Sequence, residues 1–118
     1  MKAILCVDDS RTIRKQMTFF IKKLFPDYNV HTFESGEVAL AEIENISDEL
    51  VGALIDYNME GMTGIELAEQ IVDKFPAGTV SIVSANIQDA VKAKAAELGI
   101  SFIEKPCTLE KIEKFLKV

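Results

Sequence analysis

The chain has 118 residues, 48% of them apolar, and a formal net charge of −6 at pH 7. This length fits one domain, and the apolar content is enough for a packed core, which excludes a disordered protein. The negative balance argues against a nucleic-acid-binding surface, since such surfaces need clustered lysine and arginine. No apolar run approaches the ~20 residues of a membrane-spanning helix, so no membrane insertion is expected.

The N-terminal segment and the cysteines indicate a cytoplasmic protein. Residues 3–7 are apolar but too few for a secretory signal, and two aspartates follow directly. Cys6 and Cys107 are far apart in the sequence, and we expect free thiols in a reducing compartment. His31 lies in an alternating strand pattern without a second ligand nearby, which favours a structural role.

Short apolar segments alternate with amphipathic ones along the chain. A first strand is expected at about 2–7, followed by a helix that Asp8, Asp9 or Ser10 caps and that ends before Pro26. Further strands are expected at about 28–33, 50–55, 79–83 and 100–103, and further helices at about 36–45, 63–75, 87–98 and 108–117. The alanine-rich fourth helix should pack less tightly than the first and third. This alternation predicts a parallel α/β sheet covered on both faces, with a doubly wound topology.

Polar side chains follow the strands, at the edge where doubly wound sheets bind ligands. In chain order they are Asp8 and Asp9, Asp56, Ser84 and Lys105. Two unit charges at 4 Å repel by roughly 4 kcal/mol at an effective dielectric of 20, so three clustered carboxylates need a cation or a proton to balance them. Oxygen ligands favour Mg²⁺ over zinc. We therefore predict a metal-assisted phosphoryl-acceptor site centred on Asp56.

These residues also have structural interpretations. Asp8 and Asp9 could cap the first helix, Ser84 could cap the fourth, and Lys105 could be an ordinary surface lysine. Capping accounts for one acid of the doublet but not for the second, nor for Asp56. A proline after Lys105 rigidifies the turn that would aim the ammonium at the acids. The set as a whole therefore favours one functional site.

At these spacings, Asp8-Asp9, Asp56, Ser84 and Lys105-Pro106 resemble the receiver domain of two-component response regulators. The resemblance covers essentially the whole chain as a single domain, 1–118, and is to the stand-alone chemotaxis (CheY-like) type. The segments 56–59 and 64–67 are especially similar to that family. The resemblance implies a flavodoxin-like (βα)5 fold, with a doubly wound five-stranded parallel sheet in the order 2-1-3-4-5.

The resemblance also implies roles for the site residues. Asp56 would accept a phosphoryl group from a histidine kinase. Asp9, Asp56 and the backbone carbonyl of Asn58 would bind Mg²⁺ directly, and Asp8 would act through water. Lys105 would pair first with the acceptor carboxylate and then with the phosphoryl group. The chain would thus be a phosphoacceptor signalling domain that promotes its own phosphorylation and dephosphorylation, and not an enzyme in the ordinary sense.

A conformational switch is part of the same resemblance. Ser84 would move to bind a phosphoryl oxygen, and Phe102 matches the aromatic residue that then turns inward. The surface of the fourth helix, fifth strand and fifth helix would change for a downstream partner, such as the flagellar motor, and a phosphatase would be a further partner. Two residues depart from the family pattern: Glu60 stands where proline is usual, and Phe102 where many relatives have tyrosine. Asn58 and Asn86 stand where the family tunes phosphate lifetime.

Three alternatives are considered. A flavodoxin-like FMN-binding protein would share the fold, but Asp8 and Asp9 would repel the FMN phosphate. A receiver-like interaction module that is never phosphorylated would not need the complete set of acids, hydroxyl and lysine. A hydrolase of the aspartyl-phosphate kind would have an acid where Ser10 stands.

Overall fold

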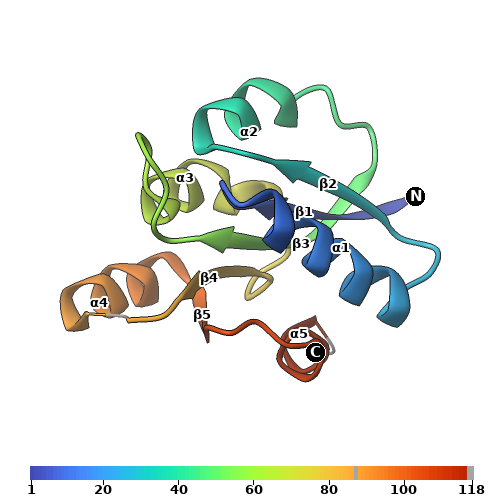
Figure 1. The fold of residues 1–118 in the computed structure, drawn as a ribbon. Coiled ribbons are helices and arrows are strands. Elements are labelled where there is room, and N and C mark those ends of the chain that lie inside the picture. The colour runs from blue at the N-terminus through green and yellow to red at the C-terminus, as the bar shows by residue number, and fades with distance from the viewer. Residues whose placement is uncertain (87, 117–118) are drawn as a thin grey trace.

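The computed structural model describes residues 1–86 and 88–116, which form a parallel sheet between two layers of helices (Figure 1). The sheet has five strands in the order β2-β1-β3-β4-β5. The strands are β1 (Lys2–Val7), β2 (Asn29–Phe33), β3 (Glu49–Asp56), β4 (Val80–Ser84) and β5 (Ser101–Glu104). The predicted doubly wound α/β fold and its strand order are confirmed.

Helices follow the strands in alternation, as predicted. They are α1 (Arg11–Leu24), α2 (Gly36–Ile43), α3 (Gly64–Ile71), α4 (Asp89–Leu98) and α5 (Leu109–Leu116), and a short 3₁₀ helix, η1 (Val72–Lys74), extends α3. One apolar cluster joins the sheet to α1 and α5, and a second joins it to α2, α3 and α4. The three inner strands, β1, β3 and β4, contribute to both clusters and therefore have both faces covered.

Several predicted bounds differ from the structure. The second helix was expected to reach residue 45 but ends at Ile43, because the amides of Asn45 and Ile46 bond three residues back and tighten the turn. The α-helical part of the third helix likewise ends at Ile71, where η1 takes over. The fourth helix begins at Asp89, and its predicted start at residue 87 lies outside the described residues, as does the predicted end at 117.

Short polar side chains begin four of the helices. The hydroxyl oxygens of Ser10, Ser35, Thr63 and Thr108 accept hydrogen bonds from backbone amides in the first turns of α1, α2, α3 and α5. Ser10 is thus the cap of α1, and neither acid of the doublet is used for that purpose. The N-cap of α4 is Gln88, so the interpretation of Ser84 as a cap is wrong.

Helix α4 is the most loosely attached of the helices that cover the sheet on its side. Of its residues only Ala95 is fully buried, whereas α3 buries four residues and α1 buries the larger side chains of Met17 and Ile21. The prediction from its alanine-rich composition is confirmed. The helix ends at Gly99, whose φ of 72° is the left-handed conformation that glycine adopts without strain.

The remaining sequence predictions concern the histidine, the cysteines and the membrane. His31 Nε2 lies 2.9 Å from Asp48 Oδ2, a contact that ties β2 to the segment before β3 and fits the predicted structural role. Cys6 and Cys107 are both free thiols. None of the helices in the described part of the chain combines the length and apolar character that crossing a bilayer requires.

Candidate functional site

Three carboxylates meet at the carboxyl ends of β1 and β3. Val7 pairs with Ile55 across these strands, so the acids that follow them lie side by side. One oxygen from each of Asp8, Asp9 and Asp56 lies within 4.8 Å of the other two. Asp8 and Asp56 are each only 2% exposed, while Asp9 faces solvent. The predicted acidic cluster is therefore present, and two of its three members are buried.

Asp8 has a carboxylate oxygen without a partner. Its Oδ1 accepts a hydrogen bond of 2.8 Å from the Ser10 amide, but its Oδ2 has no hydrogen-bond partner within residues 1–86 and 88–116. Burial, helped by the negative charge of Asp56, raises the pKa of the Asp8 carboxyl despite that bond. An unpaired buried oxygen beside two further carboxylates fits a hard divalent cation with oxygen ligands, such as Mg²⁺.

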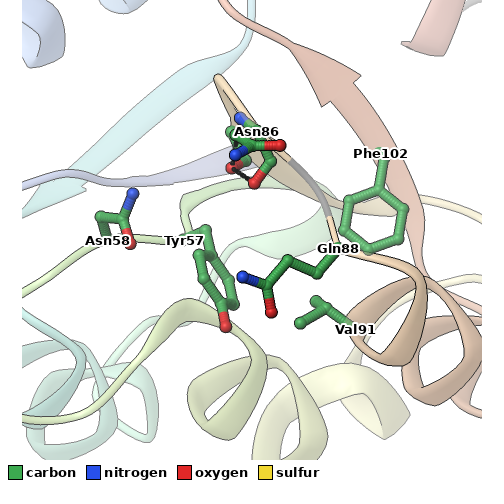
Figure 2. A pocket seen from close by; sticks show the side chains of 7 residues that line it. Tyr57, Asn58, Asn86, Gln88, Val91 and Phe102 are labelled. Carbon is green, nitrogen blue, oxygen red and sulfur yellow. Dashed lines mark hydrogen bonds between the residues drawn. The ribbon is translucent and has the colours of Figure 1, made fainter.

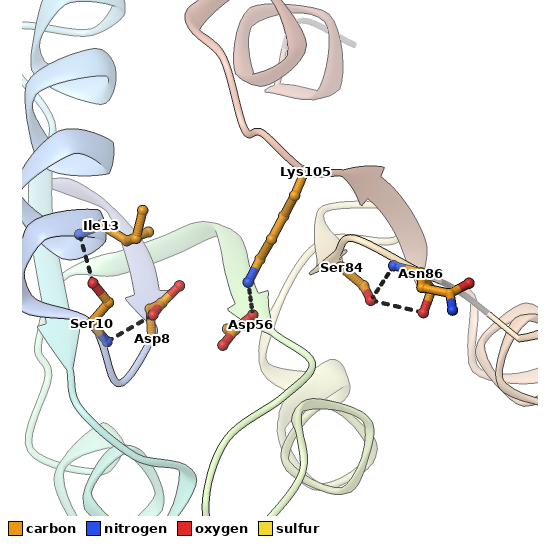
Figure 3. A network of polar contacts seen from close by, with 7 residues as sticks. All are labelled: Asp8, Ser10, Ile13, Asp56, Ser84, Asn86 and Lys105. Atoms are coloured by element: carbon orange, nitrogen blue, oxygen red, sulfur yellow. Dashed lines mark hydrogen bonds and ion pairs between the residues drawn. The ribbon is translucent and has the colours of Figure 1, made fainter.

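Lys105 supplies the positive charge of the site from the other end of the chain. Its Nζ lies 2.7 Å from Asp56 Oδ1 (Figure 3). Ser84 pairs with Glu104 between β4 and β5, and the Lys105 amide donates to the Ser84 carbonyl, which brings the lysine over the sheet edge. Partial burial disfavours the ammonium, but the bond and charge of Asp56 outweigh it and raise the pKa of Lys105. The bond from Lys105 to Pro106 is cis.

The Ser84 hydroxyl is bonded to the loop that follows it. Its Oγ donates to the Asn86 carbonyl at 3.1 Å and accepts from the Asn86 amide at 3.3 Å (Figure 3). Ser84 is 2% exposed and ends β4, which lies between the strand that ends in Asp56 and the strand that leads to Lys105. The serine therefore lies where the sequence predicts, with its hydroxyl in a local turn.

A cavity of about 210 Å³ opens beside Tyr57, the residue after Asp56, and reaches α4 (Figure 2). Its lining residues are Tyr57, Asn58, Ser84, Asn86, Gln88, Val91 and Phe102. Phe102, on β5, lies at the side of the cavity near Gln88 and Val91 (Figure 2). The predicted switch pair, Ser84 and Phe102, thus borders one cavity.

The response regulator receiver domain family matches residues 4–117. The chain belongs to this family. Receiver domains act in two-component signalling and generally bind Mg²⁺ in an acidic pocket, and the three aspartates form such a pocket in this receiver domain.

Two relatives show how receiver domains occur within longer proteins. This receiver domain is 34% identical over 108 residues to a cyclic di-GMP phosphodiesterase of Thermotoga maritima, covering 91% of this chain and 28% of that protein. It is 25% identical over 119 residues to the sensory transduction protein LytT of Bacillus subtilis, covering 99% of this chain and 47% of that protein. The chain therefore spans less than half the length of either relative.

Solved structures share the fold along almost the whole chain. A CheY-like response regulator receiver domain protein of Methanospirillum hungatei matches with a TM-score of 0.84 and 26% identity, covering 99% of this chain and 91% of that one. The chemotaxis protein CheY4 of Vibrio cholerae has a TM-score of 0.83 at 24% identity, covering 99% and 97% of the two chains, and supports the fold. Family membership sets aside the flavodoxin and hydrolase alternatives.

The sequence missed several residues of this receiver domain's site. Tyr57, Gln88 and Val91 line the cavity at the carboxyl ends of β3 and β4 but were not predicted. Tyr57 could have been found, because it directly follows Asp56 in the sequence. Gln88 and Val91 carried no signal, since their placement depends on how α4 lies against the sheet.

Proposed function

We propose that Asp56 accepts a phosphoryl group from a histidine kinase in a Mg²⁺-dependent step. The observation that carries this proposal is the ion pair between Asp56 and Lys105 at the edge of an acidic cluster that includes the unpaired oxygen of Asp8. A buried carboxylate balanced in this way is a nucleophile with positive charge already beside it. Phosphoryl transfer depends mainly on such positioning and charge neutralisation.

In the proposed step, an oxygen of Asp56 attacks the phosphorus of a phosphohistidine. The new O–P bond forms as the P–N bond breaks, and the bonding electron pair stays on the imidazole nitrogen, which leaves. Asp8, Asp9, Asp56 and the backbone carbonyl of Asn58 would hold Mg²⁺, which supplies positive charge to the phosphoryl oxygens. Lys105 would hold the acceptor carboxylate before transfer and a phosphoryl oxygen afterwards. Later attack by water would release inorganic phosphate and restore Asp56.

We further propose that Ser84 and Phe102 transmit the change. Ser84 would exchange its bonds to Asn86 for one to a phosphoryl oxygen, and Phe102 would move into the cavity it now borders. Phe102 also lines a second cavity, together with Phe115 and Lys111 of α5. A movement of this ring would therefore alter the surface of α4, β5 and α5, where a downstream partner would bind.

The cellular setting of this proposal follows from its chemistry. A histidine kinase and a phosphatase would be the partners of the phosphorylation site, and a protein of the flagellar motor or another effector would read the switch. Free thiols at Cys6 and Cys107 agree with a reducing compartment, and we place the protein in the cytoplasm. The similarity to chemotaxis proteins is the basis for proposing chemotaxis as its pathway.

The test uses the purified chain, Mg²⁺ and acetyl phosphate, with the product followed by intact mass spectrometry. One phosphoryl group should be added to the wild type and none to Asp56→Asn, and EDTA should prevent the reaction. Asp89→Asn, at an exposed aspartate of α4, is the control and should label like the wild type. Labelling that persists in Asp56→Asn would refute the proposal, and a wild type that never labels would favour the unphosphorylated interaction module.

A further inference from the structure

The loop between β3 and α3, residues 57–63, carries Asn58 and is fastened at its base. The Gly64 amide donates to the Tyr57 carbonyl at 3.1 Å, and the Tyr57 amide donates to the Val83 carbonyl at 3.0 Å. A side chain on Gly64 would overlap the carbonyl oxygen of Asp56, so the start of α3 lies directly against the acceptor. The base of the loop is thus held by the sheet and by α3.

The far end of this loop is fastened to α2 instead. Glu37, in the first turn of α2, accepts a hydrogen bond of 3.1 Å from the Met62 amide through its Oε2. Gly61 has a φ of 81°, and a Cβ there would lie 2.6 Å from the same oxygen. The Met62 side chain packs over Gly36, where an added Cβ would lie 2.9 Å from the methionine sulfur. The loop and the first turn of α2 therefore fit together on both sides of the Glu37–Met62 bond.

We propose that Glu37 is a positioning residue for the phosphorylation site. It contacts neither Asp56 nor the acids of the metal cluster in the described residues, and acts only through the loop that carries Asn58. Holding the loop raises the fraction of molecules in which the Asn58 carbonyl is placed for the metal, and apparent affinity scales with that fraction. This inference rests on the proposed function, because it assigns the carbonyl that role.

A carboxylate suits this position for two reasons. A charged acceptor makes a stronger hydrogen bond with a backbone amide than a neutral one. Glu37 also lies in the first turn of α2, where the helix dipole favours negative charge. Glutamine would keep an acceptor oxygen at the same reach while removing the charge. The two contributions, acceptor and charge, can therefore be separated by substitution.

The experiment compares Glu37→Ala and Glu37→Gln with the wild type. Glu42→Ala is the matched control, since Glu42 is an exposed glutamate of the same helix that faces away from the loop contacts described above. Three quantities are measured: the Mg²⁺ dissociation constant, the rate of labelling by acetyl phosphate, and hydrogen exchange of the Met62 amide by NMR. Circular dichroism establishes that each variant is folded.

In Glu37→Ala we expect the Mg²⁺ dissociation constant to rise about threefold to tenfold, the range for losing one such hydrogen bond. The labelling rate at low Mg²⁺ should fall in parallel, and the Met62 amide should exchange faster. In Glu37→Gln all three quantities should lie close to their wild-type values, and Glu42→Ala should change none of them. Faster exchange without a change in Mg²⁺ affinity would overturn the positioning role.

Two other results would also overturn the inference. Equal weakening by alanine and glutamine would show that only the charge of Glu37 matters, by attracting the cation from a distance. An unchanged Met62 exchange rate in Glu37→Ala would show that the contact does not hold the loop. The proposed function fails separately: in that case the wild type itself would neither bind Mg²⁺ nor accept a phosphoryl group.

Discussion

Lys105 Nζ and Asp56 Oδ1 lie 2.7 Å apart, which joins the loop after β5 to the end of the central strand β3. The pair brings together residues that are 49 positions apart in the sequence, and it depends on the parallel order β3-β4-β5. Asp56 is buried, whereas the Lys105 side chain is about one third exposed. The Lys105 ammonium therefore has room to shift toward an added negative charge, such as the proposed phosphoryl group on Asp56.

Replacing Lys105 with alanine should separate metal binding from phosphoryl transfer. Removing a positive charge beside three carboxylates should leave Mg²⁺ affinity unchanged or stronger. The labelling rate with acetyl phosphate should fall about a hundredfold, the usual effect of losing one preorganised charge partner of the transferred group. Lys105→Arg serves as the charge-conserving control. A loss of Mg²⁺ affinity that matches the loss of rate would contradict this prediction.

Asp8→Asn should stabilise the metal-free protein. The amide keeps the Oδ1 acceptor for the Ser10 amide and removes one buried negative charge from the cluster. We expect the free energy of unfolding in EDTA to rise by about 1–2 kcal/mol, since a buried charge without a full set of partners is costly. Urea unfolding at neutral pH measures this free energy for both proteins.

In the presence of Mg²⁺ the wild type should become more stable than Asp8→Asn. Mg²⁺ should raise the melting temperature of the wild type, because a ligand that binds only the folded state stabilises it, and raise it much less in Asp8→Asn or Asp9→Ala. A lower stability of Asp8→Asn in EDTA, or equal Mg²⁺ effects in all three proteins, would argue against charge repulsion in the cluster.

Gly64→Ala should damage the site and the fold together. The new methyl group would overlap the Asp56 carbonyl and lie 2.9 Å from the Tyr57 Cα, and backbone atoms move aside less easily than side chains. Overpacking of this kind costs about 1–3 kcal/mol. We expect lower stability in urea and slower labelling of Asp56 at a temperature where the variant is folded.

Gly78→Ala is the comparison for that experiment. Gly78 has a φ of 80°, and apart from its chain neighbours no atom of residues 1–86 and 88–116 lies within 4 Å of an added Cβ, so alanine there is strained without crowding Asp56. It should lose stability by about 1–2 kcal/mol and keep a normal labelling rate. Normal labelling in both glycine variants would show that the contact between α3 and Asp56 is not needed for phosphorylation.

Protonation of Asp48 should make the protein less stable in acid. Hydrogen bonds from His31 and then Asn29 lower the pKa of the Asp48 carboxyl below its ordinary value. A carboxyl with a lower pKa in the folded state stabilises the fold above its unfolded pKa of about 3.9, and that contribution is lost as pH falls through the folded pKa. The melting temperature should therefore decrease as the pH is lowered below about 4.

In Asp48→Ala the melting temperature should decrease less than in the wild type when melting curves from about pH 7 down to pH 3 are compared. Asp73→Ala, at an exposed aspartate of η1, is the control and should follow the wild type. The same slope in all three proteins would mean that the contact with His31 does not contribute to the pH dependence.

The elements of this fold could be predicted because their signals are local. Apolar runs of strand length, helical spacing of apolar residues and capping hydroxyls act within a few neighbouring residues, and they predicted each strand and helix to within a few residues. The acids could be predicted to meet because parallel strands present their carboxyl ends at one edge. The bounds of α2 and α3 were wrong by a turn or less, since 3₁₀ bonds at helix ends depend on tertiary packing.

Contacts between distant segments could not be predicted from such local signals. Composition and periodicity place Asp8, Asp9 and Asp56 at one sheet edge, because strand ends follow from the alternation of elements. They do not show that Gln88 and Val91 line the cavity, or that Glu37 accepts a hydrogen bond from the Met62 amide. Each of these depends on where a helix lies on the sheet, and that position results from the packing of the whole core.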